Sequence, residues 1–319
     1  MSDTRVAAID CGTNSIRLLV ADPPTEPGGE LVDLARRMEI VRLGQGVDRT
    51  GRLAPEAIER TRVALAEYAA QIGALGADRV RMVATSATRD ATNAADFRDM
   101  VRATLGVDPE VITGAQEARL SFTGAVRGLP SGRYLVVDIG GGSTEFVLGD
   151  STVDDAANNG PAGGGPAAIS VDMGCVRMTE RHLRDDPPSA DQIAAATLDI
   201  EVGVDKALTV VGEPAGATLV GVAGTVTTVA GIALGLPRYD PERIHHARVS
   251  TVDVRRVADE LLGMTHEQRL AVPVMHPGRA DVIGAGALIL KLILDRAGVP
   301  ELVASEHDIL DGIAYSLIG

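Results

Sequence analysis

The sequence predicts an α/β fold made of two similar halves. A strand–turn–strand pattern occurs twice, at residues 7–20 and 135–148. Short apolar runs typical of buried strands alternate with helical segments in both halves, as in α/β proteins. The chain has 319 residues, which is long enough for two domains of ordinary size.

The two copies of the pattern align without a gap. AAIDCGTNSIRLLV and LVVDIGGGSTEFVL place Asp10 on Asp138, Gly12 on Gly140 and Ser15 on Ser143; each reads as a hairpin with a tight polar turn. Glycines let a backbone approach an anion and point N–H groups at it, serines add hydroxyl donors, and an aspartate can hold hydrated Mg²⁺. One copy indicates only a turn. Two copies in register predict two hairpins that face each other across a cleft and clamp phosphates.

The first half contains a further helix, a strand, a polar loop and a short strand before its last helical segment. After the strands at 6–9 and 16–21, we expect these elements in order: a helix at 55–75 with proline in its first turn, a strand at 81–84, a polar loop at 85–90, a short strand at 111–112 and helical spacing at 116–126.

The second half begins with the second hairpin, whose strands we expect at 134–137 and 144–148. A low-complexity stretch at 150–168 predicts a mobile hairpin tip without a function. The uncharged stretch at 214–237 is interrupted by five glycines, which favours a strand, a turn and a buried helix over a membrane span. The other expected elements are a strand at 169–172, a helix at 190–208, a strand at 218–223, and helices at 252–264, 284–297 and 309–317.

Composition narrows the class of partner. The net charge is -14, aromatic residues make up 2% and there is no tryptophan, so we expect no nucleic-acid partner. Only Lys206 and Lys291 are lysines among the 30 basic residues. Arginine suits phosphate, although a GC-rich coding sequence explains the bias better. The two cysteines form no disulfide framework, and the six scattered histidines fit no zinc pattern. Without a signal or membrane segment, we expect a cytoplasmic protein.

These motifs resemble those of a known group of proteins. DCGTNSIRLLV and DIGGGSTEFVLG are similar to the two phosphate motifs of the actin-like ATPase superfamily, and GVAGTVTTVAG at 221–231 to its third motif. More narrowly, the chain resembles the exopolyphosphatase/guanosine pentaphosphate phosphohydrolase family, in its short two-domain form. The matching stretches, in family order, are VRLGQGVD, ATSATRDATN, VITGAQEARLSF, DIGGGSTE, GCVRMTER and RADVIGAGALIL.

The resemblance implies two actin-like (ribonuclease H-like) domains with a cleft between them. Domain I would span 1–117, with a C-terminal helical segment at about 301–319 packing back on it, and domain II would span 118–300. It also implies that Glu117 is the catalytic base, at the second glutamate of the family's G-x-E-E-A pattern. This chain has Gln116 where the family has the first glutamate.

The resemblance further implies Mg²⁺, with Mn²⁺ as a substitute, at Asp10, Asp138 and Glu145. Arg17 is equally well explained as a structural ion pair, and Arg89 has a surface salt bridge as its alternative role. The full set of expected substrate-binding residues is Asn14, Ser15, Arg17, Arg89, Gly140, Gly141, Gly142, Ser143, Gly224 and Thr225.

The expected function is that of an exopolyphosphatase, which hydrolyses the terminal phosphate of inorganic polyphosphate. Positioning and electrostatics dominate such phosphoryl transfer. The alternatives are hydrolysis of guanosine pentaphosphate to the tetraphosphate, a non-catalytic sensor that binds polyphosphate or alarmone, and phosphotransfer to a nucleotide. Family resemblance also suggests a homodimer.

Overall fold

The structure is a computed structural model that describes residues 4–26, 29–151 and 166–318. It divides into two compact units. Among the described residues, unit 1 holds 4–131, 151 and 308–318, and unit 2 holds 132–150 and 166–307. Most of the low-complexity stretch, residues 152–165, lies outside the described residues. No helix in the described part of the chain is both long and apolar enough to cross a membrane.

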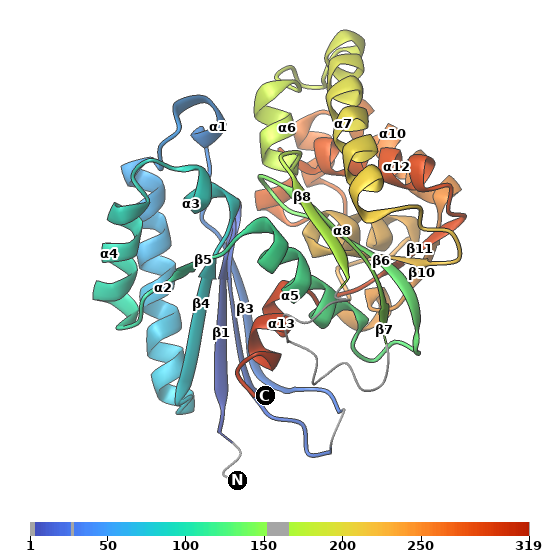
Figure 1. Ribbon diagram of the computed structural model, residues 1–319. Helices are drawn as coiled ribbons and strands as arrows, with labels where there is room; N and C mark the ends of the chain where they lie inside the picture. The colour runs from blue at the N-terminus through green and yellow to red at the C-terminus, as the bar shows by residue number, and fades with distance from the viewer. Residues whose placement is uncertain (1–3, 27–28, 152–165, 319) are drawn as a thin grey trace. The chain divides into compact units, whose positions relative to one another are not determined.

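Unit 1 is built on a mixed five-stranded sheet with the order β3-β2-β1-β4-β5 (Figure 1). β1 pairs antiparallel with β2 and parallel with β4. Its elements are β1 (Val6–Cys11), β2 (Ser15–Asp22), β3 (Val32–Ile40), α1 (Val47–Thr50), α2 (Pro55–Leu75), β4 (Arg79–Ala84), α3 (Ser86–Asp90), α4 (Ala94–Leu105), β5 (Glu110–Val111), α5 (Gly114–Val126) and α13 (Ile309–Tyr315).

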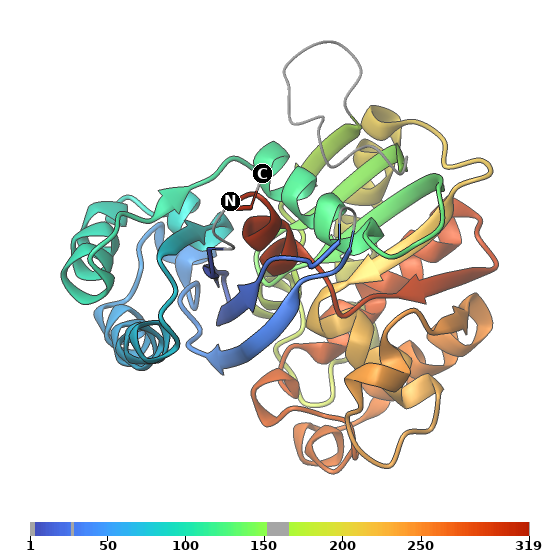
Figure 2. The ribbon, with the colours of Figure 1, turned by 90° about the horizontal axis from the view of Figure 1, so that it is seen from below.

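Both faces of this sheet are covered by helices, which explains why β1 is apolar at successive positions. Ala7 and Ile9 point into the core beside α2 and α4, whereas Val6 and Ala8 belong to the core under α13. Figure 2 shows α13 lying against the strands of unit 1. α13 also packs against α5, although more than 180 residues separate the two helices along the chain. The hairpin predicted from the first copy of the repeat is confirmed.

Unit 2 repeats this plan in a mixed six-stranded sheet with the order β10-β11-β9-β6-β7-β8. β6 pairs parallel with β9, and β9 with β11. Its elements are β6 (Gly132–Ile139), β7 (Thr144–Ser151), β8 (Ala167–Val171), α6 (Cys175–Arg181), α7 (Ala190–Val211), β9 (Thr218–Val222), α8 (Ala223–Ala233), α9 (Pro241–Ile244), β10 (Arg248–Ser250), α10 (Thr251–Gly263), α11 (His266–Leu270), a 3₁₀ turn (Pro277–Arg279), α12 (Ile283–Ala297) and β11 (Glu301–Ala304).

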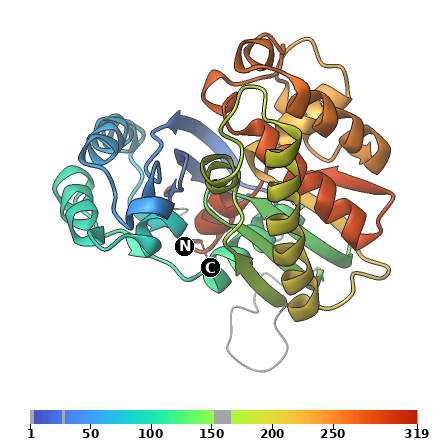
Figure 3. The same cartoon turned by 90° about the horizontal axis from the view of Figure 1, so that it is seen from above.

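The helices of unit 2 enclose one large core. α12 is buried over most of its length and packs against α7, α8 and α10, and Figure 3 shows the long α7 beside α12. The uncharged stretch is indeed a strand and a buried helix, but β9 runs into α8 without the expected turn. Ala223, the first residue of α8, makes the change of direction with a positive φ of 69°.

Three expectations are corrected. The polar loop expected at 85–90 is largely the short helix α3, in which the Arg89 N–H donates to the Thr85 carbonyl at 3.0 Å. The expected boundary after residue 117 cuts through α5, which belongs to unit 1. Unit 1 resumes at Asp308 rather than near 301. α5 stays with unit 1 because it packs against α13, where Gly124 and Gly312 let the backbones touch.

Candidate active site

In each unit the candidate residues follow the carboxyl ends of parallel strands. Asp10 is near the end of β1, Arg89 lies in α3 after β4, and Glu117 lies in α5 after β5. In unit 2 the glycine turn follows β6, and Gly224 follows β9. Ligands of α/β sheets characteristically bind at this edge, because loops there carry side chains from several strands to one place.

The first hairpin turn closes by a hydrogen bond from the Gly12 N–H to the Ser15 carbonyl, 3.0 Å long. The turn is tied to its surroundings, since the Asn14 carbonyl accepts the N–H groups of Val41 and Arg42. Asn14 and Ser15 are half-buried at its tip. Their predicted contact with phosphate stays a prediction.

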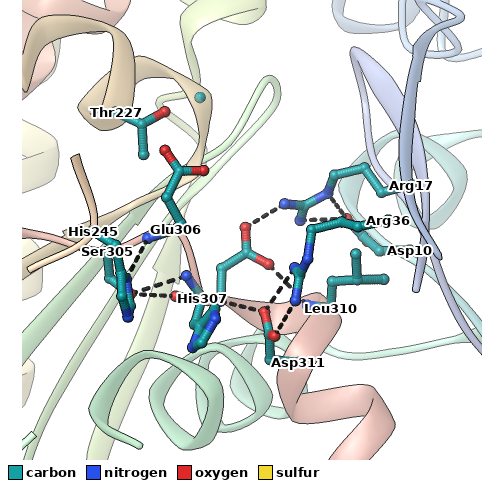
Figure 4. Close-up of polar contacts among 12 residues, drawn as sticks. Asp10, Arg17, Arg36, Thr227, His245, Ser305, Glu306, His307, Leu310 and Asp311 are labelled. Atoms are coloured by element: carbon teal, nitrogen blue, oxygen red, sulfur yellow. Dashed lines mark hydrogen bonds and ion pairs between the residues drawn. The ribbon is translucent and has the colours of Figure 1, made fainter. Parts of the chain in front are cut away.

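Arg17 makes ion pairs with two aspartates. Its Nη2 lies 2.7 Å from Asp10 Oδ2, directly across the β1–β2 ladder, and its Nη1 pairs with Asp308, the N-cap of α13 (Figure 4). Burial alone would lower the pKa of Arg17, but Asp308 and Asp10 raise it well above its ordinary value, so the guanidinium stays charged. The structure therefore favours the structural alternative for Arg17 over phosphate binding.

Arg36 extends this network at the edge of the sheet. Its Nη2 lies 2.5 Å from Asp311 Oδ1, and Asp311 Oδ2 in turn accepts the N–H of Asp308 in a capping box. The ion pairs fasten the start of α13 to β1, β2 and β3. The sequence analysis missed Arg36, Asp308 and Asp311, because strand β3 and the cap of the last helix carry no motif.

One carboxylate oxygen of Asp10, Oδ1, is buried and has no hydrogen-bond partner among the described residues. Burial raises the pKa of Asp10, and this effect outweighs the opposing charge of Arg17. No group of three or more His, Cys, Asp or Glu side chains among the described residues is placed to hold a metal. A magnesium ion needs only one or two carboxylates and retains several waters, so the donor set fits it.

Glu117 and Arg89 are brought together. Arg89 Nη1 lies 3.1 Å from Glu117 Oε2 and 3.1 Å from the Ile112 carbonyl. The Glu117 carboxylate is buried, with 10% of the side chain exposed, whereas 26% of Arg89 is exposed. Arg89 thus forms an ion pair with the expected base, and its predicted contact with phosphate stays a prediction.

The unusual Gln116 has a structural role. Its N–H and side chain form a capping box with Thr113 at the start of α5: the Thr113 N–H donates to Gln116 Oε1 at 2.9 Å. A capping box accepts either glutamine or glutamate at this position. The departure from the family pattern therefore leaves the helix start, and with it Glu117, in place.

The second hairpin turn closes like the first. The Gly140 N–H donates to the Ser143 carbonyl at 3.0 Å. The carbonyls of Gly140, Gly141 and Gly142 all accept hydrogen bonds from the first turn of α6 or from its Arg177 side chain. The turn is therefore held rigidly from one side.

Two buried carboxylates flank this turn, one near the end of β6 and the other near the start of β7. Asp138 is 6% exposed and Glu145 is 1% exposed. Glu145 Oε1 accepts hydroxyl hydrogen bonds from Ser143 at 2.7 Å and from Ser170 at 2.6 Å. The Ser143 hydroxyl donates to Glu145, and its predicted contact with phosphate stays a prediction.

The two candidate residues of the third motif, Gly224 and Thr225, lie at the start of α8. Thr225 is buried, and its side chain fills the space left by Gly286 of α12. At Gly224 the place of a Cβ is taken by the guanidinium of Arg279, whose Nη1 lies 3.4 Å from the Gly224 carbonyl. Arg279 lies in one of the quoted motifs, but spacing alone does not show that it reaches α8.

The sequence analysis also missed a polar cluster in unit 2, part of which Figure 4 shows. The Tyr239 hydroxyl lies 2.7 Å from both Thr227 Oγ1 and Glu306 Oε1. Figure 4 shows Thr227, Glu306 and His245 of this cluster. The Glu306 N–H donates to His245 Nδ1, and the His245 ring stacks on His246 with centroids 3.7 Å apart. These residues come from α8, from the segment between α8 and β10, and from the loop after β11, so no single motif contains them.

Comparison with known proteins gives one family. The model of the Ppx/GppA phosphatase family matches residues 25–318. A relative named exopolyphosphatase 2, from Mycobacterium tuberculosis, is 50% identical over 331 aligned positions that cover 100% of both chains. A bifunctional 3-dehydroquinate synthase/phosphatase from Fusobacterium nucleatum is 33% identical over 96% of this chain and 45% of its own.

Solved structures point to the same family as the sequence comparisons. The crystal structure of an exopolyphosphatase-like protein superposes with a TM-score of 0.89 at 41% identity, covering 98% of this chain and 97% of that one. The Aquifex aeolicus member of the Ppx/GppA family superposes with a TM-score of 0.78 at 32% identity, again over 98% and 97%.

Proposed function

Because the chain belongs to the Ppx/GppA phosphatase family, we propose that it is an exopolyphosphatase, which releases the terminal phosphate of inorganic polyphosphate. The name of the full-length relative at 50% identity supports this substrate. One structural observation carries the proposal: the buried carboxylate of Glu117, oriented by Arg89 at the carboxyl edge of the unit 1 strands.

Glu117 acts as the general base. It accepts a proton from a water molecule as the water oxygen attacks the terminal phosphorus. The bond from that phosphorus to the bridging oxygen breaks, the shortened chain leaves with the electron pair, and the proton stays on Glu117 until solvent removes it. Arg89 holds the carboxylate by an ion pair, so that its orientation is set before the substrate binds.

Backbone N–H groups of the glycine turn bind the phosphate oxygens. Preorganised donors of this kind stabilise charge on the equatorial oxygens without reorganising during the reaction. Gly141, Gly142 and Ser143 supply these groups in unit 2, because the carbonyls of the preceding residues, Gly140 to Gly142, are already engaged by α6 and Arg177. In unit 1 the turn from Gly12 to Ser15 has the same closing hydrogen bond and supplies the corresponding donors.

In unit 1 the residue that would hold magnesium is Asp10, through the unpartnered Oδ1. In unit 2 the residues that would hold magnesium are Asp138 and Glu145. When bound, the ion neutralises part of the charge of the polyphosphate, and manganese would serve in its place. The same residues would otherwise repel the polyanion.

Guanosine pentaphosphate is the competing substrate, and a sensor without turnover is the non-catalytic alternative. Phosphate release from polyphosphate and from guanosine pentaphosphate, measured side by side with Mg²⁺ and with chelator, separates them. A homodimer stays a prediction, which light scattering tests.

The decisive experiment is single-turnover phosphate release by Glu117→Gln, with equilibrium binding of the same polyphosphate. We expect turnover to fall about 10²–10⁴-fold, the usual span for a general base, while binding changes much less. Glu59→Gln is the matched control, because Glu59 pairs with Arg62 on the exposed surface of α2. Hydrolysis near the wild-type rate would show that Glu117 is not the base. Loss of both binding and hydrolysis in a folded protein would make Glu117 a structural anchor.

A further inference from the structure

We propose that Arg177 is a positioning residue for the reaction: it fixes the glycine turn of unit 2 so that the turn's N–H groups face the substrate. This inference rests on the proposed function and adds a residue that the phosphate motifs do not contain. Arg177 lies in α6, in the stretch GCVRMTER, and its side chain is 12% exposed.

Four hydrogen bonds tie the turn to α6. The Cys175 N–H donates to the Gly140 carbonyl at 2.9 Å, and the N–H groups of Val176 and Arg177 donate to the Gly141 carbonyl at 2.9 and 3.1 Å. The third carbonyl, that of Gly142, accepts from Arg177 Nε at 2.7 Å. Three consecutive carbonyls of the turn are thus held, the last one by a side chain.

The direction of the carbonyls sets the direction of the donors. In a planar trans peptide the C=O and N–H point to opposite sides. Carbonyls that point at α6 therefore turn the N–H groups of Gly141, Gly142 and Ser143 away from α6, as successive donors of an anion-binding nest. The orientation of the peptide group between Gly142 and Ser143 depends on the hydrogen bond from the Arg177 side chain.

The packing of α6 on the turn leaves little room for another arrangement. A Cβ at Gly174 would overlap the backbone of Gly141 and Gly142, so the two segments meet at backbone contact. Arg177 Nη2 also lies 3.9 Å from Asp172, an ion pair that contributes little because 74% of the Asp172 side chain is exposed. The short bond from Nε to the Gly142 carbonyl is the contact that the proposal assigns to positioning.

Two uncharged variants separate positioning from direct charge contact. Arg177→Gln keeps an N–H donor at the ε position of the side chain, whereas Arg177→Met places a methyl group there. If Nε positions the turn, kcat/KM of the Gln variant stays within about threefold of wild type, and that of the Met variant falls roughly 10–100-fold. Arg184→Gln, which removes an exposed arginine just after α6, is the control for loss of charge.

Equal falls in both variants would overturn the proposal, because they would show that the positive charge itself meets the substrate. Full activity in both would overturn it as well. Thermal unfolding of each variant checks that the fold persists.

Hydrogen exchange gives a readout that does not depend on activity. Loss of the Nε donor would loosen the turn, so the amides of Cys175 and Val176 should exchange about tenfold faster in Arg177→Met and at the wild-type rate in Arg177→Gln. Unchanged exchange in Arg177→Met would refute the positioning role. If wild type releases no phosphate from polyphosphate, the proposed function fails, and the exchange experiment still decides whether Arg177 holds the turn.

Discussion

The crossing of α5 and α13 in unit 1 gives a sharp test of how the fold holds the base. The two helices meet at Gly124 and Gly312 with their backbones in contact. In a Gly312→Ala variant the new Cβ would lie 2.7 Å from the carbonyl carbon of Leu120 and closer still to its oxygen. Neither partner is a flexible side chain end, so the helices themselves must move apart.

The size of the effect follows from this geometry. The distance is roughly 1 Å shorter than the 3.5–4.0 Å at which non-bonded carbon atoms rest. Overpacking usually costs 1–3 kcal/mol, and a clash with backbone belongs at the upper end, so we expect a loss of about 3 kcal/mol. The displacement is carried along α5 to Glu117, and a misplacement of about 1 Å at a reacting group can cost 10²-fold in rate.

The assay measures urea unfolding of unit 1 within the full protein, and phosphate release from polyphosphate is measured for the same variants. Gly73→Ala in α2 is the matched control, because no atom lies within 4 Å of the added Cβ. That substitution should stabilise the protein by about 0.5–1 kcal/mol, as expected for alanine in a helix interior. A Gly312→Ala variant as stable and active as the control would refute the close helix contact and its link to Glu117.

Three further predictions concern single side chains. Arg36→Leu should lower the free energy of unfolding by about 3 kcal/mol in denaturant titrations, because it leaves the buried Asp311 charge without its guanidinium. Burial raises the pKa of the Cys175 thiol to about 11, so iodoacetamide at pH 8 should label it only after unfolding. Burial raises the pKa of Asp199, but the hydrogen bonds from His182 and Arg181 outweigh this effect and hold the pKa below its usual value. Asp199→Asn should therefore cost less than about 1 kcal/mol at pH 7, and this difference should disappear as pH falls through the lowered pKa, as measured by unfolding at several pH values.

The repeated hairpin could be predicted because two aligned copies of one sequence pattern both indicated a strand, a turn and a strand. Both turns close with the same bond, from the glycine N–H to the serine carbonyl, in the positions that the alignment paired. The helix at 55–75 was predicted with its bounds, since proline at its start and Gly76 after its end mark both termini. α3 and β3 were missed because they are short or exposed and carry no strong periodicity.

The parts of the site that were missed depend on contacts distant in sequence. Arg177 and Gly142 are 35 residues apart, and Arg17 and Asp308 are 291 residues apart. Periodicity and spacing describe neighbours within one element, so they cannot show which side chain reaches another element. The pairing of Arg17 with Asp10 was accessible, because the register of a hairpin closed between Gly12 and Ser15 places them opposite each other.

The same register exposes the main difference between the two hairpins. In unit 1 Asp10 stands opposite Arg17, so the pair carries no net charge. The second turn closes with the same bond, which places Asp138 opposite Glu145, two carboxylates that are both buried. Like charges opposite each other destabilise a hairpin unless something compensates them. A divalent cation matches the charge of this second pair, and it does not match the neutral first pair. The requirement for magnesium should therefore depend more on Asp138 and Glu145 than on Asp10, although the repeat makes Asp10 and Asp138 look equivalent.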